Sequence, residues 1–173
     1  MAGTTLYEAS IPTFQNGLTS LKAILTKAVE HYGEDVSSLP SATLIDNLLP
    51  LDKHVQVASN VAKKFLERVA DIPTEVWPDT EDTAEKLIQR CQRTLDLLAT
   101  VTPAQIDGLE EKRIEFSLGQ HHHLVMSAKE YVLRYAVPFF FFHTQLAYSI
   151  LRAKGVPIGY ADFLMPHIGP FTQ

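Results

Sequence analysis

Apolar residues recur at three- and four-residue steps along several stretches of the chain, a spacing that places them on one face of an α-helix. Three such stretches precede residue 102, at residues 6–32, 51–70 and 80–101. The connection at residues 34–51 is rich in Asp, Ser and Pro but also carries apolar residues. A connection of that length with apolar residues of its own is expected to pack over the helices and to contain short helical turns.

The ends of these helices carry residues that stop or start a helix. Gly33 is expected to end the first helix, because glycine readily adopts the left-handed conformation of a helix terminus. Asp71-Ile72-Pro73 is expected to end the second, because proline cannot continue a helix. The third is expected to hold acidic side chains in its first turn, where the helix dipole favours negative charge: Glu81, Asp82 and Glu85.

A fourth helix, about 27 residues and roughly 40 Å long, is predicted over residues 127–155. Ser127 and Glu130 match a capping box, in which each side chain satisfies a free backbone N–H. Gly155 can close the last turn. Pro138 lacks an N–H and its ring would clash with the carbonyl of the residue four positions earlier, so a kink is predicted there.

Four consecutive phenylalanines, Phe139–Phe142, make this helix apolar on every side near its middle. A helix that is apolar all round is buried on more than one side. We therefore expect this segment to need a second surface, and a homodimer would supply one. His143 follows directly, on the stripe that faces the core.

Between the third and fourth helices the period changes. Residues 112–118 alternate polar and apolar side chains, as is typical of a strand. Gly119-Gln120 can turn the chain into a second strand at residues 121–126, which gives a small β-hairpin. The pattern therefore predicts an all-α fold: a four-helix bundle with a long crossover and a small β-hairpin before the last long helix, forming a single domain over residues 1–173.

The composition is ordinary for a soluble globular chain and excludes several classes of function. Its 173 residues are 46% hydrophobic and 20% charged, with a formal net charge of −5. A nucleic-acid-binding protein needs a basic patch, and none is visible. The longest near-apolar run, residues 135–142, is far below the roughly 20 residues that span a bilayer. The N-terminal residues have neither the basic region nor the apolar core of a signal peptide, so neither nucleic acid nor membrane is expected as a partner.

The single cysteine, Cys91, excludes an internal disulfide. It lies on the apolar stripe of the third helix, so a buried structural thiol is expected rather than a reactive one. One unpaired cysteine fits a reducing compartment. The predicted localisation is therefore cytoplasmic.

Three consecutive histidines, His121–His123, suggest metal binding at first sight. Adjacent residues on a strand point to opposite faces, so at most His121 and His123 could share an ion. A structural zinc site needs four ligands, and no cysteine or carboxylate cluster lies nearby in the sequence. We therefore expect a solvated strand or turn here rather than a native metal site.

His143 and His54 are stronger candidates, because each lies on the core stripe of its helix. His143 has Phe139 one turn before it and Ala147 one turn after it, so a His-x-x-x-His pair is absent. Two histidines can converge here at most, one fewer than the three protein ligands of a catalytic zinc. The favoured interpretation is a core histidine hydrogen-bonded to a neighbour such as Tyr148, Gln145 or a backbone carbonyl. A third interpretation is that His143 is a general base in an aromatic pocket, kept neutral by burial.

Other catalytic signatures are absent from the sequence. It contains no Gly-rich phosphate loop, no Gly-x-Ser-x-Gly elbow and no Cys-x-x-Cys motif. The acidic pairs Glu110-Glu111 and Glu81-Asp82 are expected to lie at solvated helix ends or in loops.

Several motifs together resemble those of a family known only as a domain of unknown function. The longest is Phe140-Phe-Phe-His143-x4-Tyr148-x-Ile-Leu-Arg152-x2-Gly155-Val-Pro, followed by Gly159-x2-Asp162-Phe-Leu. The others are Tyr7-x-Ala-Ser-x-Pro12, Leu49-Pro-Leu-x3-Val55-Gln-Val-Ala58, Glu81-Asp-Thr and Ala104-Gln-Ile-Asp107. The resemblance covers nearly the whole chain and is strongest over residues 131–164.

That family is grouped with the DinB/YfiT-like metalloenzymes, so the resemblance implies a four-helix bundle that is often a homodimer. It also implies a histidine triad that binds a divalent metal, and some members of the superfamily transfer low-molecular-weight thiols. The triad takes one histidine from the second helix and an i, i+4 pair from the last long helix. Carried over, His143 matches the second member of the pair, Phe139 stands at the first, and His54 approximately matches the third.

Two hypotheses of function follow. The first is an uncharacterised DinB-like bundle protein, a homodimer with a degenerate metal site and a pocket for a small ligand at Phe139, Phe142 and Tyr148. This hypothesis requires no cofactor. The alternative is a metal-dependent hydrolase or thiol transferase in which His54 and His143 bind a divalent ion, zinc or nickel. The sequence identifies no substrate for either.

Overall fold

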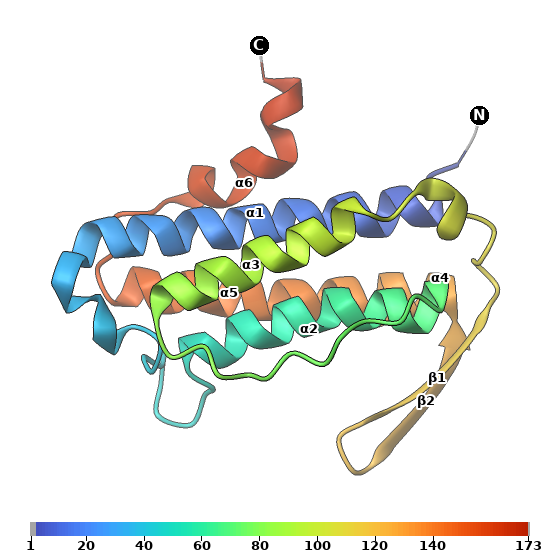
Figure 1. Cartoon of the computed structure of the whole chain (residues 1–173), viewed down its shortest axis with the longest axis horizontal. Helices are drawn as coiled ribbons and strands as arrows, with labels where there is room; N and C mark the ends of the chain where they lie inside the picture. Colours follow the sequence, from blue (N-terminus) through green and yellow to red (C-terminus); the bar gives the residue numbers. More distant parts are fainter. Residues whose placement is uncertain (1–2, 173) are drawn as a thin grey trace.

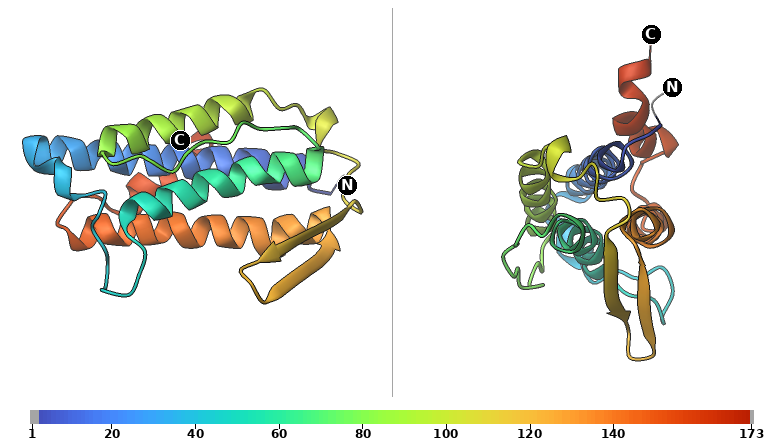
Figure 2. Two further views of the ribbon diagram at one scale, coloured as in Figure 1. Left: turned by 60° about the horizontal axis from the view of Figure 1, so that its bottom comes forward. Right: turned by 90° about the vertical axis from the view of Figure 1, so that its right-hand side faces the viewer.

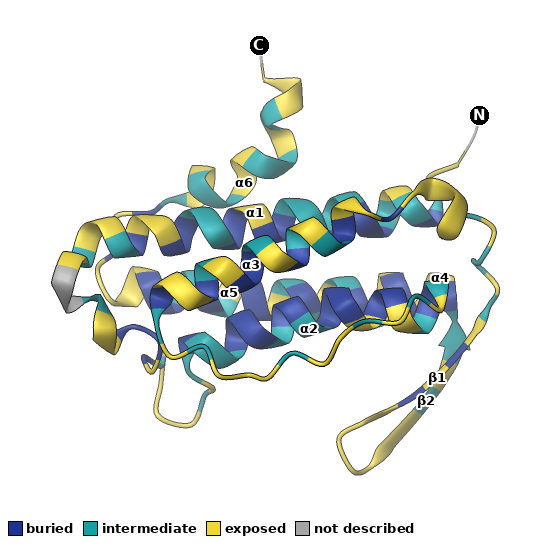
Figure 3. Cartoon of the chain, viewed as in Figure 1, coloured by how far each residue is buried: buried dark blue, intermediate teal, exposed yellow. Residues whose placement is uncertain are grey.

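The computed structural model describes residues 3–172, apart from the side chains of residues 34 and 35. Four long helices lie side by side: α1 (Leu6–Tyr32), α2 (Leu51–Ala70), α3 (Ala84–Ala99) and α5 (Val137–Ala153) (Figure 1). Both α1 and α2 pack against α3 and against α5, as the end-on view in Figure 2 shows. The buried faces of all four helices point into one core (Figure 3). The predicted four-helix bundle is confirmed.

Two long connections set the directions of the helices. The first, residues 33–50, opens with the 3-10 helix η1 (Gly33–Ser38) and therefore contains the helical turn that the sequence predicts. The second, residues 71–83, runs back along α2, so that α2 and α3 point in the same direction (Figure 1). The bundle thus has one long crossover, residues 71–83, because α1 and α2 run antiparallel and residues 33–50 join them at one end (Figure 1).

Residues 71–83 form neither helix nor strand, yet they are fixed to the bundle by one buried cation. Arg90 of α3, whose side chain is 1% exposed, lies 2.9 Å from Asp79 and 2.8 Å from Glu81. Its guanidinium also donates to the carbonyl of Pro78 and to the side chain of Asn60 on α2. A buried charge is stable only when it is paired and hydrogen-bonded, and here the loop supplies most of the partners.

The same ion pairs explain why α3 begins at Ala84 instead of residue 80. Thr83 caps the helix by accepting a hydrogen bond from the N–H of Lys86. The predicted positions of Glu81 and Asp82 in the first turn are therefore wrong, whereas their expected place in a loop is confirmed. The Glu81 side chain is 16% exposed there. Arg90 holds Glu81 in the loop that precedes the helix, a contact that helical periodicity cannot predict.

The predicted hairpin is present as β1 (Arg113–Leu118) and β2 (His122–Ser127), paired antiparallel with Ile114 opposite Met126. Phe116 fixes it to the bundle. The ring of Phe116 lies 5.4 Å from that of Tyr131 and 4.7 Å from that of Tyr135, centroid to centroid. Aromatic pairs at this spacing contribute beyond the area that they bury.

The last long helix begins at Ser127, as predicted. The Ser127 hydroxyl accepts from the N–H of Glu130, whose carboxylate accepts from the N–H of Ser127. A short α4 (Ala128–Glu130) leads into the π-helical segment η3 (Tyr131–Ala136) and then into α5. At the end of this segment the N–H of Val137 bonds to the carbonyl of Val132, five residues back. The disturbance predicted at Pro138 thus takes the form of a wider helical turn directly before it.

A further helix, α6 (Tyr160–Ile168), followed by the 3-10 turn η4 (Gly169–Phe171), is not predicted by the sequence pattern. It packs against α1, and η4 projects away from the bundle (Figure 1). The Ser20 hydroxyl of α1 donates to the carbonyl of Phe163 at 2.6 Å, and Lys27 pairs with Asp162 at 2.5 Å. No helix among residues 3–172 is long and apolar enough to cross a membrane.

The four phenylalanines of α5 have four different surroundings. Phe140 is buried against Phe14 of α1, and the ring of Phe141 lies 6.4 Å from that of Phe163 on α6. Phe139 is half-buried, whereas Phe142 is 53% exposed. The helix α6 therefore supplies much of the second surface that this segment needs, and the homodimer stays a prediction.

Candidate functional site

The structure brings together the two histidines that the sequence singles out. His54 lies in the first turn of α2 and His143 in the middle of α5, two helices that pack against each other. Their Nδ1 atoms are 2.8 Å apart, although 89 positions separate the residues in the chain. The side chains are almost fully buried, with exposed fractions of 1% for His54 and 3% for His143.

Helical spacing places each histidine on the buried face of its helix. Ala58, one turn after His54, is buried on the same face of α2. Ala147, one turn after His143, is likewise buried on α5. The centroids of the two imidazole rings lie 5.0 Å apart.

Burial keeps both imidazoles neutral. Loss of hydration, together with positive charge on His54, lowers the pKa of His143 to about 4. Burial also lowers the pKa of His54, although the carbonyl of Leu49 and the carboxylate of Asp52 raise it in part. At neutral pH two neutral rings therefore face each other, and the Nδ1–H of one donates to the Nδ1 of the other.

This hydrogen bond determines whether the Nε2 atom of each ring carries a proton or a lone pair. A neutral imidazole carries one N–H and one lone pair, so the ring that donates at Nδ1 has a bare Nε2. The ring that accepts at Nδ1 carries its proton on Nε2. Both Nε2 atoms are buried and have no hydrogen-bond partner among the described residues. The pair therefore presents one unused donor and one unused acceptor, which is unusual for buried polar atoms.

As arranged, these side chains do not fit a metal ion. Phe139 stands one turn before His143, with its ring edge-on at 4.6 Å between centroids, and its carbon atoms cannot coordinate an ion. Within residues 3–172, apart from side chains 34 and 35, no three His, Cys, Asp or Glu side chains lie close enough to hold an ion. Binding one ion through both rings would require either both Nδ1 atoms or both Nε2 atoms to be free of protons, whereas the hydrogen bond between the two Nδ1 atoms, 2.8 Å apart, needs one Nδ1 with a proton and one without.

The low pKa of His143 also bears on general-base chemistry. An efficient general base has a pKa near the working pH, whereas the pKa of His143 lies at about 4. At neutral pH the imidazole is therefore a weak base. The geometry favours the interpretation of His143 as a hydrogen-bonded core residue, but its partner is His54 instead of the expected Tyr148, Gln145 or backbone carbonyl.

The other sequence candidates lie elsewhere. Cys91 is buried in α3, and burial raises the pKa of its thiol to about 12, so the predicted buried thiol is confirmed. His121–His123 are exposed at the end of the hairpin, as predicted. His123 Nε2 lies 2.8 Å from a carboxylate oxygen of Glu115 on the neighbouring strand.

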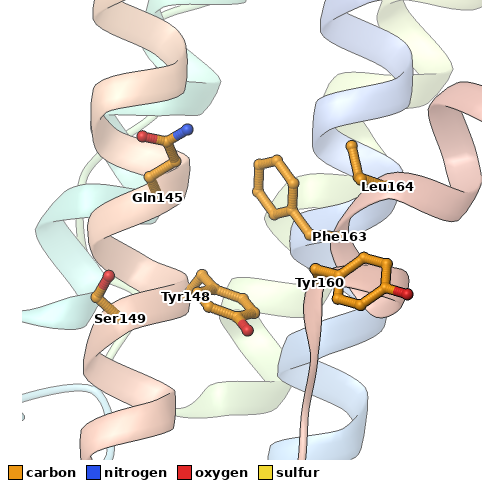
Figure 4. A pocket seen from close by; sticks show the side chains of 6 residues that line it. All are labelled: Gln145, Tyr148, Ser149, Tyr160, Phe163 and Leu164. Atoms are coloured by element: carbon orange, nitrogen blue, oxygen red, sulfur yellow. The ribbon is translucent and has the colours of Figure 1, made fainter.

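A pocket of about 290 Å³ lies between α5 and α6 (Figure 4). It is lined by Gln145, Tyr148, Ser149, Tyr160, Phe163 and Leu164. Of the predicted pocket residues only Tyr148 belongs to this lining, because Phe139 contacts His143 and Phe142 is exposed. Tyr160, Phe163 and Leu164 were missed together with α6, and Gln145 and Ser149 of α5 were not predicted as pocket residues. Their signal is the helical spacing of Tyr160, Phe163 and Leu164 directly after Gly159.

Comparisons with known proteins agree with this fold. The sequence model of the family described as "Domain of unknown function (DUF1993)" matches residues 6–164. The chain is also similar to the crystal structure of a DinB family member protein from Shewanella denitrificans. The two are 29% identical with a TM-score of 0.77, over 92% of this chain and 91% of that chain. No curated protein matches the chain.

Proposed function

The chain belongs to the family described as Domain of unknown function (DUF1993) and has a DinB-like fold, and from this we propose that it is a metal-free, ligand-binding bundle protein that acts as a homodimer. In this proposal residues still occupy the positions of the family's metal ligands, but they bind no metal. His54 and His143 remain as a buried hydrogen-bonded pair. Phe139 takes the place of the third ligand.

The observation that carries the proposal is the contact between His54 and His143. Metal ligands face an ion and are separated by it, whereas these two rings bond directly to each other at 2.8 Å. Phe139 closes the remaining side with an apolar ring at 4.6 Å from His143, centroid to centroid. A low dielectric strengthens the hydrogen bond between the two rings, so the pair stabilises the contact between α2 and α5 without an ion.

The dimer part of the proposal is supported by apolar side chains that the chain itself leaves exposed. On α6 and η4, outside the pocket lining, these are Met165, Ile168 and Phe171. Clustered exposed apolar residues mark interaction surfaces, and η4 projects from the bundle where a second copy can reach it (Figure 1). Light scattering at micromolar protein concentration should give the mass of a dimer, and the mass of a monomer would contradict this part.

One observation favours the alternative, a metal-dependent hydrolase or thiol transferase that uses His54 and His143 with zinc or nickel. Both Nε2 atoms are buried without a hydrogen-bond partner in the described part of the chain, and buried nitrogen atoms are rarely left so. This alternative needs rotation of the rings and a third ligand from a carboxylate, water or substrate.

Elemental analysis separates the two functions. Tag-free protein, purified without metal affinity, should contain no stoichiometric zinc, nickel or other divalent metal. The variant Phe139→His completes the triad and should gain binding of zinc when the metal is added. Phe142→His adds a histidine on the other side of His143, outside the triad position, and should gain none. One metal ion per wild-type chain, lost in His143→Ala, would overturn the metal-free proposal and establish the alternative.

A further inference from the structure

The pocket between α5 and α6 is walled by aromatic rings. Tyr148 of α5 and Phe163 of α6 meet edge to face, with centroids 6.1 Å apart and an interplanar angle of 75°. Tyr160, which is 80% exposed, lies on the open side next to them. Figure 4 shows Tyr148 reaching from α5 towards the rings of Phe163 and Tyr160. A flat ligand can therefore contact ring surfaces from both helices.

The wall formed by α6 is held in place before any ligand binds. The carbonyl of Phe163 accepts a hydrogen bond from Ser20, and Asp162 accepts from the N–H of Gly159 at 2.7 Å. On its far side the ring of Phe163 stacks on His167, with centroids 6.2 Å apart. A preformed pocket loses little conformational entropy when it binds a ligand.

The polar groups of the pocket carry no charge. They are the amide of Gln145 and the hydroxyl groups of Tyr148, Ser149 and Tyr160. Asp162, next to Phe163 in the sequence, pairs with Lys27 at 2.5 Å, and Arg152, about one turn after Tyr148 and Ser149 on α5, does not line the pocket. A charged ligand that loses its hydration needs an opposite charge, and the lining offers none. An uncharged ligand meets both a hydrogen-bond donor and an acceptor on Gln145.

We propose that this pocket binds a small, uncharged aromatic molecule that carries a hydrogen-bonding group. The inference rests on the ligand-binding part of the proposed function and names the class of its ligand. A volume of about 290 Å³ lies at the lower end of small-molecule sites and suits a molecule of one or two rings. The rings of Tyr148, Phe163 and Tyr160 bind its faces, and Gln145 binds its polar group.

Titration of the full-length protein with indole tests the inference by calorimetry and ligand-observed NMR. Tyr160→Ala should weaken indole binding by about three- to tenfold, the usual effect of losing one aromatic contact. Phe171→Ala is the matched control. Phe171 is 83% exposed in the same C-terminal segment but does not line the pocket, so this variant should bind indole as the wild type does. Because both side chains are exposed, neither variant should impair folding.

Charged probes of similar size test the ligand class. Benzoate and benzyltrimethylammonium should both bind more weakly than indole. No binding of indole, an equal loss in Phe171→Ala, or tighter binding of either charged probe would overturn the inference. Failure here leaves the metal analysis of His54 and His143 unaffected. A metal-loaded wild type that still binds indole through Tyr160 would overturn only the metal-free proposal.

Discussion

The Nδ1 atoms of His54 and His143 lie 2.8 Å apart across the contact between α2 and α5. At neutral pH two neutral rings of opposite tautomer make this bond, because burial lowers the pKa of both imidazoles. Phe139 packs edge-on against His143 and excludes water from that side. The pair is therefore a buried structural contact whose strength depends on pH.

Stability is expected to fall as the pH drops from about 6.5 to about 4. In the unfolded chain His143 takes up a proton near its ordinary pKa of 6.5, whereas in the folded protein its pKa is about 4. Between these values the unfolded state binds more protons, so the free energy of unfolding decreases with falling pH. The loss from His143 alone is roughly 3 kcal/mol. Urea unfolding at pH 7.0 and at pH 4.5 measures this loss. The free energy of unfolding should be lower at pH 4.5 by ~2 kcal/mol or more.

The double variant His54→Leu, His143→Leu is the control for this dependence. Apolar residues of similar volume replace the pair without leaving an unpaired group, so folding should be kept. The variant should lose most of the slope between pH 6.5 and 4.5. A smaller slope should remain from His167, whose pKa is also lowered by burial. If wild type and double variant show the same slope, the histidine pair is not its cause.

Among the residues that attach the 71–83 loop to the bundle, Arg90 should lower the free energy of unfolding most when it is substituted. Arg90→Ala leaves Asp79 and Glu81 without their buried partner and should lower the free energy of unfolding by about 3 kcal/mol. Arg93→Ala, one turn away, removes an exposed pair with Glu75 and should cost about 1 kcal/mol or less. Equal effects of the two substitutions in chemical denaturation would show that the buried ion pairs do not fix the loop.

Gly17 is required where α1 and α5 approach closely. A Cβ atom at this position would lie 2.3 Å from the Cε1 atom of Phe140, whose ring is fully buried and cannot move aside. Gly17→Ala should therefore destabilise the protein by about 1–3 kcal/mol, despite the better helix propensity of alanine. Gly169→Ala meets no neighbouring atom and serves as control. A Gly17→Ala protein that melts at or above the wild-type temperature would contradict this packing.

Local signals were sufficient to predict most of the fold. The capping box of Ser127 and Glu130, the glycine after α1 and the alternating residues of the hairpin act over a few positions, so the sequence shows them directly. The start of α3 was wrong because Arg90 holds Glu81 through a contact that joins a loop to a helix. The helix α6 was missed because Pro166 interrupts a short helical pattern near the end of the chain.

The candidate site was predictable only in part. Periodicity places His54 and His143 on buried faces, and the position of Phe139 shows that a histidine pair on α5 is absent. Whether two histidines 89 positions apart touch depends on the register between α2 and α5, which periodicity does not determine. The pocket at Tyr148 needs α6 as its second wall, so it could not be predicted without that helix. The homodimer and the cytoplasmic localisation stay predictions.

NMR of the histidine side chains tests the central claim most directly. In protein labelled with 15N-histidine at pH 7, His54 and His143 should be neutral and of opposite tautomer. A two-bond coupling between their Nδ1 atoms should report the hydrogen bond between them, and added zinc should change neither signal. The contradictory result is no coupling together with the same tautomer on both rings, as binding one metal ion through both Nδ1 atoms or through both Nε2 atoms requires.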